Sequence, residues 1–226
     1  MPQLKENVTR PEILLEATVT GNREIVPGVH LISWKRDHYF EPGMVIKLTV
    51  NKDIVPRIYS ICSGNQEEEI RVLFSIKEEG LLTPLLSKTG IGDKIWVSEP
   101  YGSFLDNKKP AWWIATGTGI APFYSMFRSG ISDNRTLIQG SRSLNQFYFE
   151  DEFQKAMSGR YIRCCAHEPS SDVFPGRVTQ YLQQIDKLPA DIYYYLCGKA
   201  IMVVEVRDLL ISKGIPYEHI LSEIYF

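Results

Sequence analysis

Arg57, Tyr59 and Ser60 are the first side chains along the chain whose types and spacing suit chemistry. Pro56 comes just before them, and because proline is tolerated at the first residue of a strand but not in its centre, a strand is expected to start there. Side chains two positions apart share one face of a strand, so Arg57 and Tyr59 project together and Ser60 projects to the other side. A guanidinium, a phenol ring and a hydroxyl suit a ligand that has a phosphate and a flat ring. Four residues alone favour the alternative, an ordinary strand with a surface Arg and a half-buried Tyr.

A second group of residues surrounds a glycine-rich turn. Gly117, Thr118 and Gly119 follow the apolar run 111–115 and precede a helix start. This order of strand, turn and helix lets backbone N–H groups approach a pyrophosphate. Pro122 stands where the dinucleotide-binding fingerprint has its third glycine, so the turn predicts a nucleotide site other than the standard one. A tight turn without a ligand is the alternative.

The residues after the next predicted strand bear on the choice of nucleotide. An NAD site would place Asp or Glu there to bind the ribose 2′-hydroxyl. The chain has Ser141 and Arg142 instead, and Arg177 is a second candidate cation. A hydroxyl and a guanidinium suit a 2′-phosphate, which a carboxylate would repel. The pattern therefore favours NADP, although each arginine taken singly is equally compatible with a solvated surface position.

Thr83, Cys197 and two C-terminal aromatic residues complete the candidates. Thr83 precedes Pro84 and is predicted to be the N-cap of a short helix. The start of a helix binds anions, although a hydroxyl that merely caps its own helix is the favoured alternative. Cys197 ends a strand on the side where open α/β sheets bind ligands, and a buried structural cysteine is the alternative. Tyr225 and Phe226 either pack on something or leave an exposed apolar patch.

The composition of the 226 residues is that of an ordinary globular protein, with 44% hydrophobic and 23% charged residues. This length can form two modest cores. A formal net charge of -2 predicts neither a nucleic-acid nor a membrane partner. Residues 1–10 lack the apolar core of a signal peptide, and the apolar stretch 111–127 is interrupted by glycine and proline. A cytoplasmic location is therefore expected.

The cysteines have no spacing that is typical of a metal site. They are Cys62, Cys164, Cys165 and Cys197, and no two of them form a C-x-x-C pair. They make neither a zinc nor an iron–sulfur ligand set, and no metal is expected. Reduced, buried thiols are expected at Cys62, Cys164 and Cys165, and at Cys197 a buried thiol is the alternative to a place at the ligand site.

The elements that position these residues change character near residues 106–110. Before this polar stretch, short runs rich in Val, Ile, Thr and aromatics predict strands at 14–20, 29–34, 44–50, 57–63, 70–76 and 95–98. Their spacing indicates a six-stranded antiparallel barrel, with the helix at Thr83 as its cap. The domain boundary is predicted here, with residues 1–107 and 108–226 as the two domains.

Beyond this boundary, strand-like and helical runs alternate. Strands are expected at 111–115, 136–139, 161–166 and 192–196, and helices at 121–128, 149–157, 178–185 and 200–213. Alternation of this kind indicates a parallel sheet covered by helices on both faces. We expect an α/β nucleotide-binding domain with a five-stranded sheet.

Six motifs in a fixed order resemble those of one known family. They are Arg57-x-Tyr59-Ser60, Gly80-x-x-Thr83, Glu99-Pro100-Tyr101-Gly102-Ser103-Phe104, Gly117-Thr118-Gly119-Ile120-Ala121-Pro122, Cys197-Gly198 and Glu223-Ile224-Tyr225-Phe226. The set spans essentially the whole chain and resembles the ferredoxin–NADP⁺ reductase family, most of all its compact bacterial ferredoxin/flavodoxin reductases. The chain departs from that pattern at His167, where several relatives have Arg, and at Phe226, where some have Trp.

The resemblance implies a site for each of two cofactors, FAD in the barrel and NADP in the second domain. Tyr59 and Tyr225 would stack on opposite faces of the flavin, and Phe226 would lie near its adenine. The implied FAD residues are Arg57, Ile58, Tyr59, Ser60, Ile76, Gly80, Leu81, Leu82, Thr83, Thr118, Tyr225 and Phe226. The implied NADP residues are Gly117, Thr118, Gly119, Ser141, Arg142, Arg177 and Cys197. Those implied at the place of hydride transfer are Ser60, Cys197, Glu223 and Tyr225.

The activity that the resemblance implies is electron transfer by a monomeric enzyme. Hydride would pass between nicotinamide C4 and flavin N5, and single electrons would pass between the flavin and a separate ferredoxin or flavodoxin. The alternative among enzymes is an NAD(P)H-dependent flavin reductase or oxygenase reductase component that shares this module. A binding module without turnover is the alternative from another class, and the groups at the place of hydride transfer argue against it.

Overall fold

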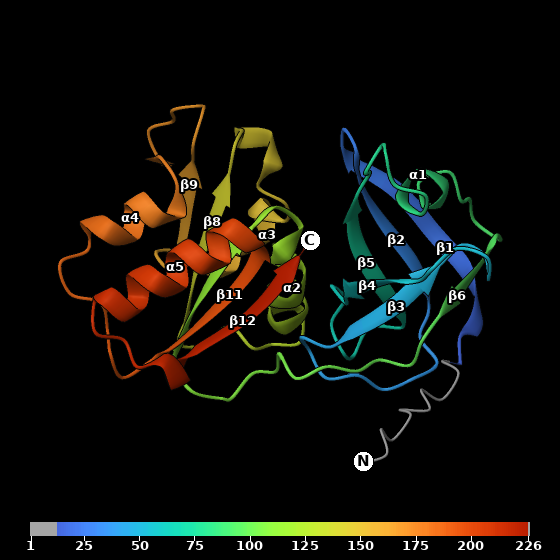
Figure 1. Ribbon diagram of the computed structural model, residues 1–226, viewed down its shortest axis with the longest axis horizontal. Coiled ribbons are helices and arrows are strands. Elements are labelled where there is room, and N and C mark those ends of the chain that lie inside the picture. Colours follow the sequence, from blue (N-terminus) through green and yellow to red (C-terminus); the bar gives the residue numbers. More distant parts are fainter. Residues whose placement is uncertain (1–12, 226) are drawn as a thin grey trace, which may run out of the picture.

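Two six-stranded sheets make up the part of the chain that the computed structural model describes, residues 13–225 (Figure 1). The strands of the first sheet are β1 (Leu15–Val26), β2 (Val29–Lys35), β3 (Val45–Thr49), β4 (Arg57–Ser60), β5 (Glu69–Ser75) and β6 (Lys94–Val97). They are ordered β4-β3-β6-β1-β2-β5, and every neighbouring pair is antiparallel. An isolated bridge between Ile61 and Val72 joins the two ends of this sheet, which closes it into the predicted barrel.

The interior of the barrel is filled by large apolar side chains. Trp34, Phe40 and Phe74 are almost fully buried there. The short helix α1 (Thr83–Leu86) lies over one end of the barrel (Figure 1), and Leu82 and Leu86 belong to the same buried cluster. The predicted capping helix is therefore confirmed.

The second sheet is parallel throughout. Its strands are β7 (Ala111–Thr116), β8 (Arg135–Ser141), β9 (Tyr161–Cys165), β10 (Phe174–Pro175), β11 (Tyr193–Lys199) and β12 (Ile220–Tyr225), in the order β10-β9-β8-β7-β11-β12. Its helices are α2 (Ala121–Arg128), α3 (Glu150–Ala156), α4 (Val178–Gln184) and α5 (Ala200–Ser212), with short 3-10 turns η1 (Gly117–Ile120), η2 (Leu144–Gln146) and η3 (Tyr217–His219). No helix within residues 13–225 is long and apolar enough to cross a bilayer.

The second sheet is buried on both faces, as the alternation of strands and helices predicts. Trp113 of β7 packs with α2 and α3, while the next residue, Ile114, packs with α4 and α5. Tyr195 and Leu196 of β11 divide in the same way. Side chains on a strand alternate between its faces, so a strand covered on both sides carries a nearly continuous apolar run.

This sheet has six strands, where five were expected and only four were located in the sequence. β10 consists of only two residues, too few to be recognised from the sequence. β12 carries Ser222 and Glu223 between its apolar residues, and these polar side chains hide the pattern of a buried strand. The two-domain β plus α/β architecture is otherwise as predicted.

The barrel and the second sheet share one hydrophobic cluster. Val29, Leu31 and Leu73 of the barrel belong to the same buried group as Phe123 and Tyr124 of α2. Figure 1 accordingly shows α2 and α3 on the side of the second sheet that faces the barrel. Apolar side chains from both sheets therefore pack against one another between them.

The segment that connects the sheets is itself bound to the second one. Asp106 and Arg135 form an ion pair of 2.6 Å between side chains that are only 7% and 5% exposed. The N–H of Asn107 donates to the hydroxyl of Tyr195 at 3.0 Å. The domain boundary between residues 107 and 108 stays a prediction, and these contacts tie the residues on its N-terminal side to the second sheet.

Candidate functional site

The end of β12 brings two predicted site residues to the barrel. β12 pairs with β11 so that Glu223 lies opposite Cys197 and Tyr225 lies opposite Lys199. Glu223 and Tyr225 are two residues apart on one strand and therefore point to the same side. In Figure 1 this strand, drawn in red, runs toward the barrel.

Ser60, the last residue of β4, meets both side chains. Its hydroxyl donates a hydrogen bond to Oε1 of Glu223 at 2.5 Å. The hydroxyl of Tyr225 in turn donates to Oγ of Ser60, also at 2.5 Å. Residues separated by more than half the chain thus form one line of hydrogen bonds from Tyr225 through Ser60 to Glu223, and Cys197 lies beside it. We call these four residues the junction.

Burial sets the protonation of the junction. It raises the pKa of the Glu223 carboxyl above its usual value, and the hydrogen bond from Ser60 opposes that rise. Burial also raises the pKa of the Cys197 thiol, and the nearby Glu223 carboxyl adds to the effect. The pKa of Tyr225 is raised for the same two kinds of reason, burial first and neighbouring acidic groups second. The junction therefore favours uncharged groups that keep their protons.

The other residues of β4 follow the predicted alternation in part. Arg57 and Ile58 are exposed, Tyr59 is half-buried and Ser60 is buried. The ring of Tyr59 packs edge-on against Phe74, with 6.3 Å between the centroids. Burial raises its pKa to about 12, while the Arg57 charge lowers it slightly. An exposed guanidinium beside a half-buried ring fits a phosphate and a planar group.

A compact turn contains the remaining barrel residues of the prediction, Ile76, Gly80, Leu81, Leu82 and Thr83. The Thr83 hydroxyl accepts the N–H of Lys77 at 2.8 Å and so closes this turn. The N-cap prediction for Thr83 is therefore wrong: α1 begins at Thr83 itself, and its N-cap is Leu82, without a side-chain cap. Leu81 is 78% exposed beside the turn. Phe226, the last implied FAD residue, lies outside the described residues.

The glycine-rich turn lies directly against the end of β11. A Cβ added to Gly119 would come within 2.4 Å of the carbonyl oxygen of Cys197, so no larger residue fits there. Gly117 has a φ of +56°, and no atom lies within 4 Å of its Cβ position, so the backbone is open to a ligand. The buried hydroxyl of Thr116 has no hydrogen-bond partner within residues 13–225. A bare backbone turn beside an unpartnered hydroxyl fits a pyrophosphate.

The predicted 2′-phosphate residues lie at the carboxyl end of the sheet, at or just after the ends of β8 and β10, which are three and five strands away from β12. Ser141, Cys165 and Pro175 are in register across β8, β9 and β10, so Arg142 and Arg177 leave the same edge. Both arginines are exposed. We call the loops that carry them, together with residues 166–168, the ribose edge.

Ser141 is less suited to a phosphate than its type indicates. Its hydroxyl accepts the N–H of Ser143 at 3.1 Å and donates back to the Ser143 carbonyl. Both of its roles are thus used within its own turn. Sequence reasoning also missed Glu168, whose carboxylate accepts the N–H of Leu144 at 2.7 Å at this edge.

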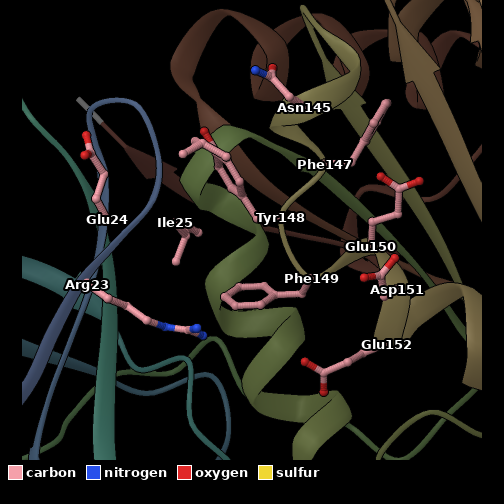
Figure 2. A pocket seen from close by; sticks show the side chains of 11 residues that line it. Arg23, Glu24, Ile25, Asn145, Phe147, Tyr148, Phe149, Glu150, Asp151 and Glu152 are labelled. Atoms are coloured by element: carbon pink, nitrogen blue, oxygen red, sulfur yellow. The ribbon is translucent and has the colours of Figure 1, made fainter.

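A cavity of about 490 Å³ lies elsewhere between the two sheets (Figure 2). The β1 residues Arg23 and Ile25 face residues 145 and 147–152 across it. Phe149 lines it with a φ of +62° and stacks on Tyr124 at 3.7 Å between centroids. None of the predicted site residues lines this cavity.

Comparison with known proteins shows which proteins the chain is similar to. The model of the oxidoreductase NAD-binding domain matches residues 113–208. A ferredoxin–NADP reductase from Azotobacter vinelandii is 34% identical over 208 residues, which cover 78% of this chain and 80% of that protein. The chain belongs to the ferredoxin–NADP⁺ reductase family. A second reductase of this family, from Pseudomonas aeruginosa, is 32% identical over the same shares of both chains.

Other curated relatives are longer than this chain. The toluate 1,2-dioxygenase electron transfer component of Pseudomonas putida is 29% identical over 78% of the chain, which spans only 56% of that relative. The chain thus covers about half the length of several curated relatives it matches. The structure of a ferredoxin–NADP⁺ reductase from Neisseria gonorrhoeae with bound FAD and NADP superposes with a TM-score of 0.86 at 21% identity, covering 94% of this chain and 99% of that one. The two share their fold.

Proposed function

We propose that this chain is an FAD-dependent reductase that transfers electrons between NADP(H) and a ferredoxin or flavodoxin. The observation that carries the proposal is the line of hydrogen bonds from Tyr225 through Ser60 to Glu223, which joins the barrel to the nucleotide-binding sheet. FAD, when bound, supplies the redox chemistry, since its N5 exchanges a hydride with nicotinamide C4 and the ring then exchanges single electrons. Residues 1–107 and 108–226 would be the two domains that meet at this junction.

The barrel residues would hold FAD. Arg57 is exposed and suits the pyrophosphate, while the half-buried ring of Tyr59 suits the flavin. Ile76, Gly80, Leu81, Leu82 and Thr83 would border the same cofactor through the turn that the Thr83 hydroxyl closes. Because that hydroxyl is already bonded to Lys77, it is a weaker phosphate ligand than its type alone predicts. Backbone groups of the turn are the better candidates.

The junction residues would orient the two rings. Ser60 and Glu223 fix each other's position beside the place where the two rings would meet. Holding the rings together there would convert an encounter of two molecules into a unimolecular step. Cys197 and Glu223 lie side by side on β11 and β12, where they would border the nicotinamide. Tyr225 would cover one face of the flavin and move aside when nicotinamide binds.

The second sheet would bind NADP(H) along its carboxyl edge. Gly117, Thr118 and Gly119 would receive the pyrophosphate at the open turn. Arg142 and Arg177 would face the 2′-phosphate from the ribose edge, and Ser141 would support the loop that carries Arg142. A cytoplasmic location and a monomeric state complete the proposal.

A second candidate function is supported by the relatives themselves. Curated proteins that match the chain include dioxygenase electron transfer components and a propane 2-monooxygenase reductase component. The chain would then be the NAD(P)H-dependent reductase part of an oxygenase system, or a flavin reductase. The residues at the junction serve either role, because only the electron acceptor differs.

The deciding experiment begins with the purified protein and its absorption spectrum. A bound flavin is expected, and NADPH added without oxygen is expected to bleach it. Rapid reduction of a ferredoxin or flavodoxin would favour the first candidate, and a preference for free flavin or an oxygenase component would favour the second. A colourless protein without affinity for FAD would refute both, and bound flavin without oxidation of NADPH by any artificial acceptor would indicate a binding module.

A further inference from the structure

The loops after β8 and β9 are tied together at the ribose edge. The N–H of Ala166 donates to the carbonyl of Ser141 at 3.0 Å, and the N–H of His167 donates to the carbonyl of Arg142 at 3.1 Å. The side chain of Glu168 completes the connection, because its Oε2 accepts the N–H of Leu144 at 2.7 Å. Hydrogen bonds to residues 166–168 thus hold the loop that carries Arg142 at both of its ends.

This connection brings a carboxylate to the loop of Arg142. In nucleotide-binding sheets the residues after the second strand lie at the adenosine ribose, and an acidic side chain there accepts a hydrogen bond from the 2′-hydroxyl. β8 is the second strand of this sheet in chain order, but its own loop carries no acid between Ser141 and Leu144. Glu168 reaches the same loop from the third strand. The exposed Arg142 and the exposed Glu168 therefore present opposite charges on adjoining loops.

We propose that Glu168 is a specificity-determining residue that weakens the preference of this chain for NADPH over NADH. Its carboxylate repels a 2′-phosphate and accepts a hydrogen bond from a 2′-hydroxyl, which opposes the effect of Arg142 and Arg177. The inference rests on the proposed function, because it concerns the nucleotide of that same site. Sequence reasoning cannot find this residue, since it follows a different strand from the one that the standard NAD pattern uses.

Glu168→Gln separates charge from structure. The glutamine keeps an oxygen that can accept the N–H of Leu144, so the loop keeps its anchor while the negative charge is removed. Because both loops are exposed, solvent screens the charge of Glu168. Screened interactions of this kind change the affinity for a nucleotide by at most about fivefold. Glu205→Gln is the matched control, since Glu205 is an exposed acid on α5 whose side chain forms no hydrogen bond or ion pair within residues 13–225.

The test measures Kd for NADP⁺ and for NAD⁺ by calorimetry on the flavin-loaded protein, together with kcat/KM for NADPH and NADH. Glu168→Gln is expected to raise the ratio of Kd for NAD⁺ to Kd for NADP⁺ by about threefold to fivefold, and salt at about 0.5 M should reduce that change. Glu205→Gln should leave the ratio as it is in the wild type. A ratio that does not rise in Glu168→Gln, or that rises equally in the control, overturns the inference. Failure of the wild type to bind either nucleotide would instead overturn the proposed function.

Discussion

The junction and the ribose edge lie at the same end of one sheet, yet they are built differently. At the junction, Ser60, Glu223 and Tyr225 come from both sheets and bond to one another at 2.5 Å. At the ribose edge, Arg142 and Arg177 stand on exposed loops, and neither forms an ion pair with another residue of the described chain. The side chains of the first region are fixed by their own contacts, and the arginine side chains of the second are open to solvent.

The difference in burial determines what each region can do. Groups in a buried site interact strongly and have little freedom, so they can position reacting rings. Charges on exposed loops are screened, so each contributes little and can be exchanged without disturbing the fold. We infer that the junction governs the rate of hydride transfer and that the ribose edge governs which nucleotide binds. Substitutions should then affect kcat at one region and relative affinity at the other.

The largest effect is expected from Ser60→Ala. This change removes the hydroxyl that connects Glu223 to Tyr225. Loss of positioning at a reacting centre can cost about a hundredfold in rate, so kcat for NADPH oxidation with ferricyanide should fall by about that factor. Ser33→Ala is the control, because Ser33 is also a buried serine of the barrel but bonds to Thr20 instead. A kcat in Ser60→Ala close to that of the control would contradict the role of the junction.

Tyr225→Ser is expected to alter binding and turnover in opposite directions. The ring of Tyr225 occupies space beside Cys197, where the nicotinamide would have to enter. Without this ring NADP⁺ should bind more tightly by about tenfold, and its slower release should lower kcat. The control is Tyr217→Ser, which removes a tyrosine that is 69% exposed. Calorimetry gives the decisive number, since an unchanged Kd for NADP⁺ would refute this prediction.

The sequence predicted the two regions unequally, for a physical reason. Local patterns identified the strand at Arg57, the glycine-rich turn and the arginines, because each depends on neighbours in the chain. The bond between Ser60 and Glu223 spans 163 positions, and no periodicity encodes it. Glu223 was found only through the resemblance to a family, and the ring of Tyr225 was noted from the sequence but was given its role only through that resemblance.

Local hydrogen bonds explain most of the remaining differences. The hydroxyls of Thr83 and Ser141 are used within turns, by Lys77 in the first case and Ser143 in the second. Residue type indicates what a hydroxyl can bind, but only the folded backbone shows whether it is already bonded. Strand β12 was missed for a related reason, since the polar Glu223 that interrupts its apolar pattern is the side chain that faces Ser60.

At the ribose edge, Arg142→Ala should change nucleotide choice without changing kcat. Removal of one exposed guanidinium should raise KM for NADPH by about fivefold, because charge interactions at exposed sites are of that size. KM for NADH should stay constant, since NADH has no 2′-phosphate. Arg207→Ala serves as the control, because Arg207 pairs with Asp208 on α5. Equal changes of KM for both nucleotides would place Arg142 outside the 2′-phosphate site.

The smallest effect tests the burial of the junction through stability rather than rate. Burial raises the pKa of Glu223 in the folded protein, while the unfolded chain keeps a value near 4.5. Because the pKa of Glu223 is higher in the folded protein, folding favours the protonated carboxyl. The contribution of this carboxyl to the free energy of unfolding is complete below the pKa of the unfolded chain. It is lost as the pH rises through the pKa of the folded protein. Glu223→Gln, which has no charge at any pH, should therefore raise Tm by a few degrees at pH 7 and bring no gain at pH 4.

Thermal unfolding of the flavin-loaded protein at the two pH values measures this difference, with Glu205→Gln as the exposed control. The hydrogen bond from Ser60 stabilises the ionised carboxylate and works against the expected gain. Cys197 and Tyr225 are the titratable groups whose pKa the charge of Glu223 raises further. In the double variant with Ser60→Ala that opposing bond is absent, so the gain from Glu223→Gln at pH 7 should be larger there than in the wild type. A gain that is the same at both pH values would mean that burial does not govern the charge of Glu223. The contrast between a largely buried junction and an open ribose edge would then fail.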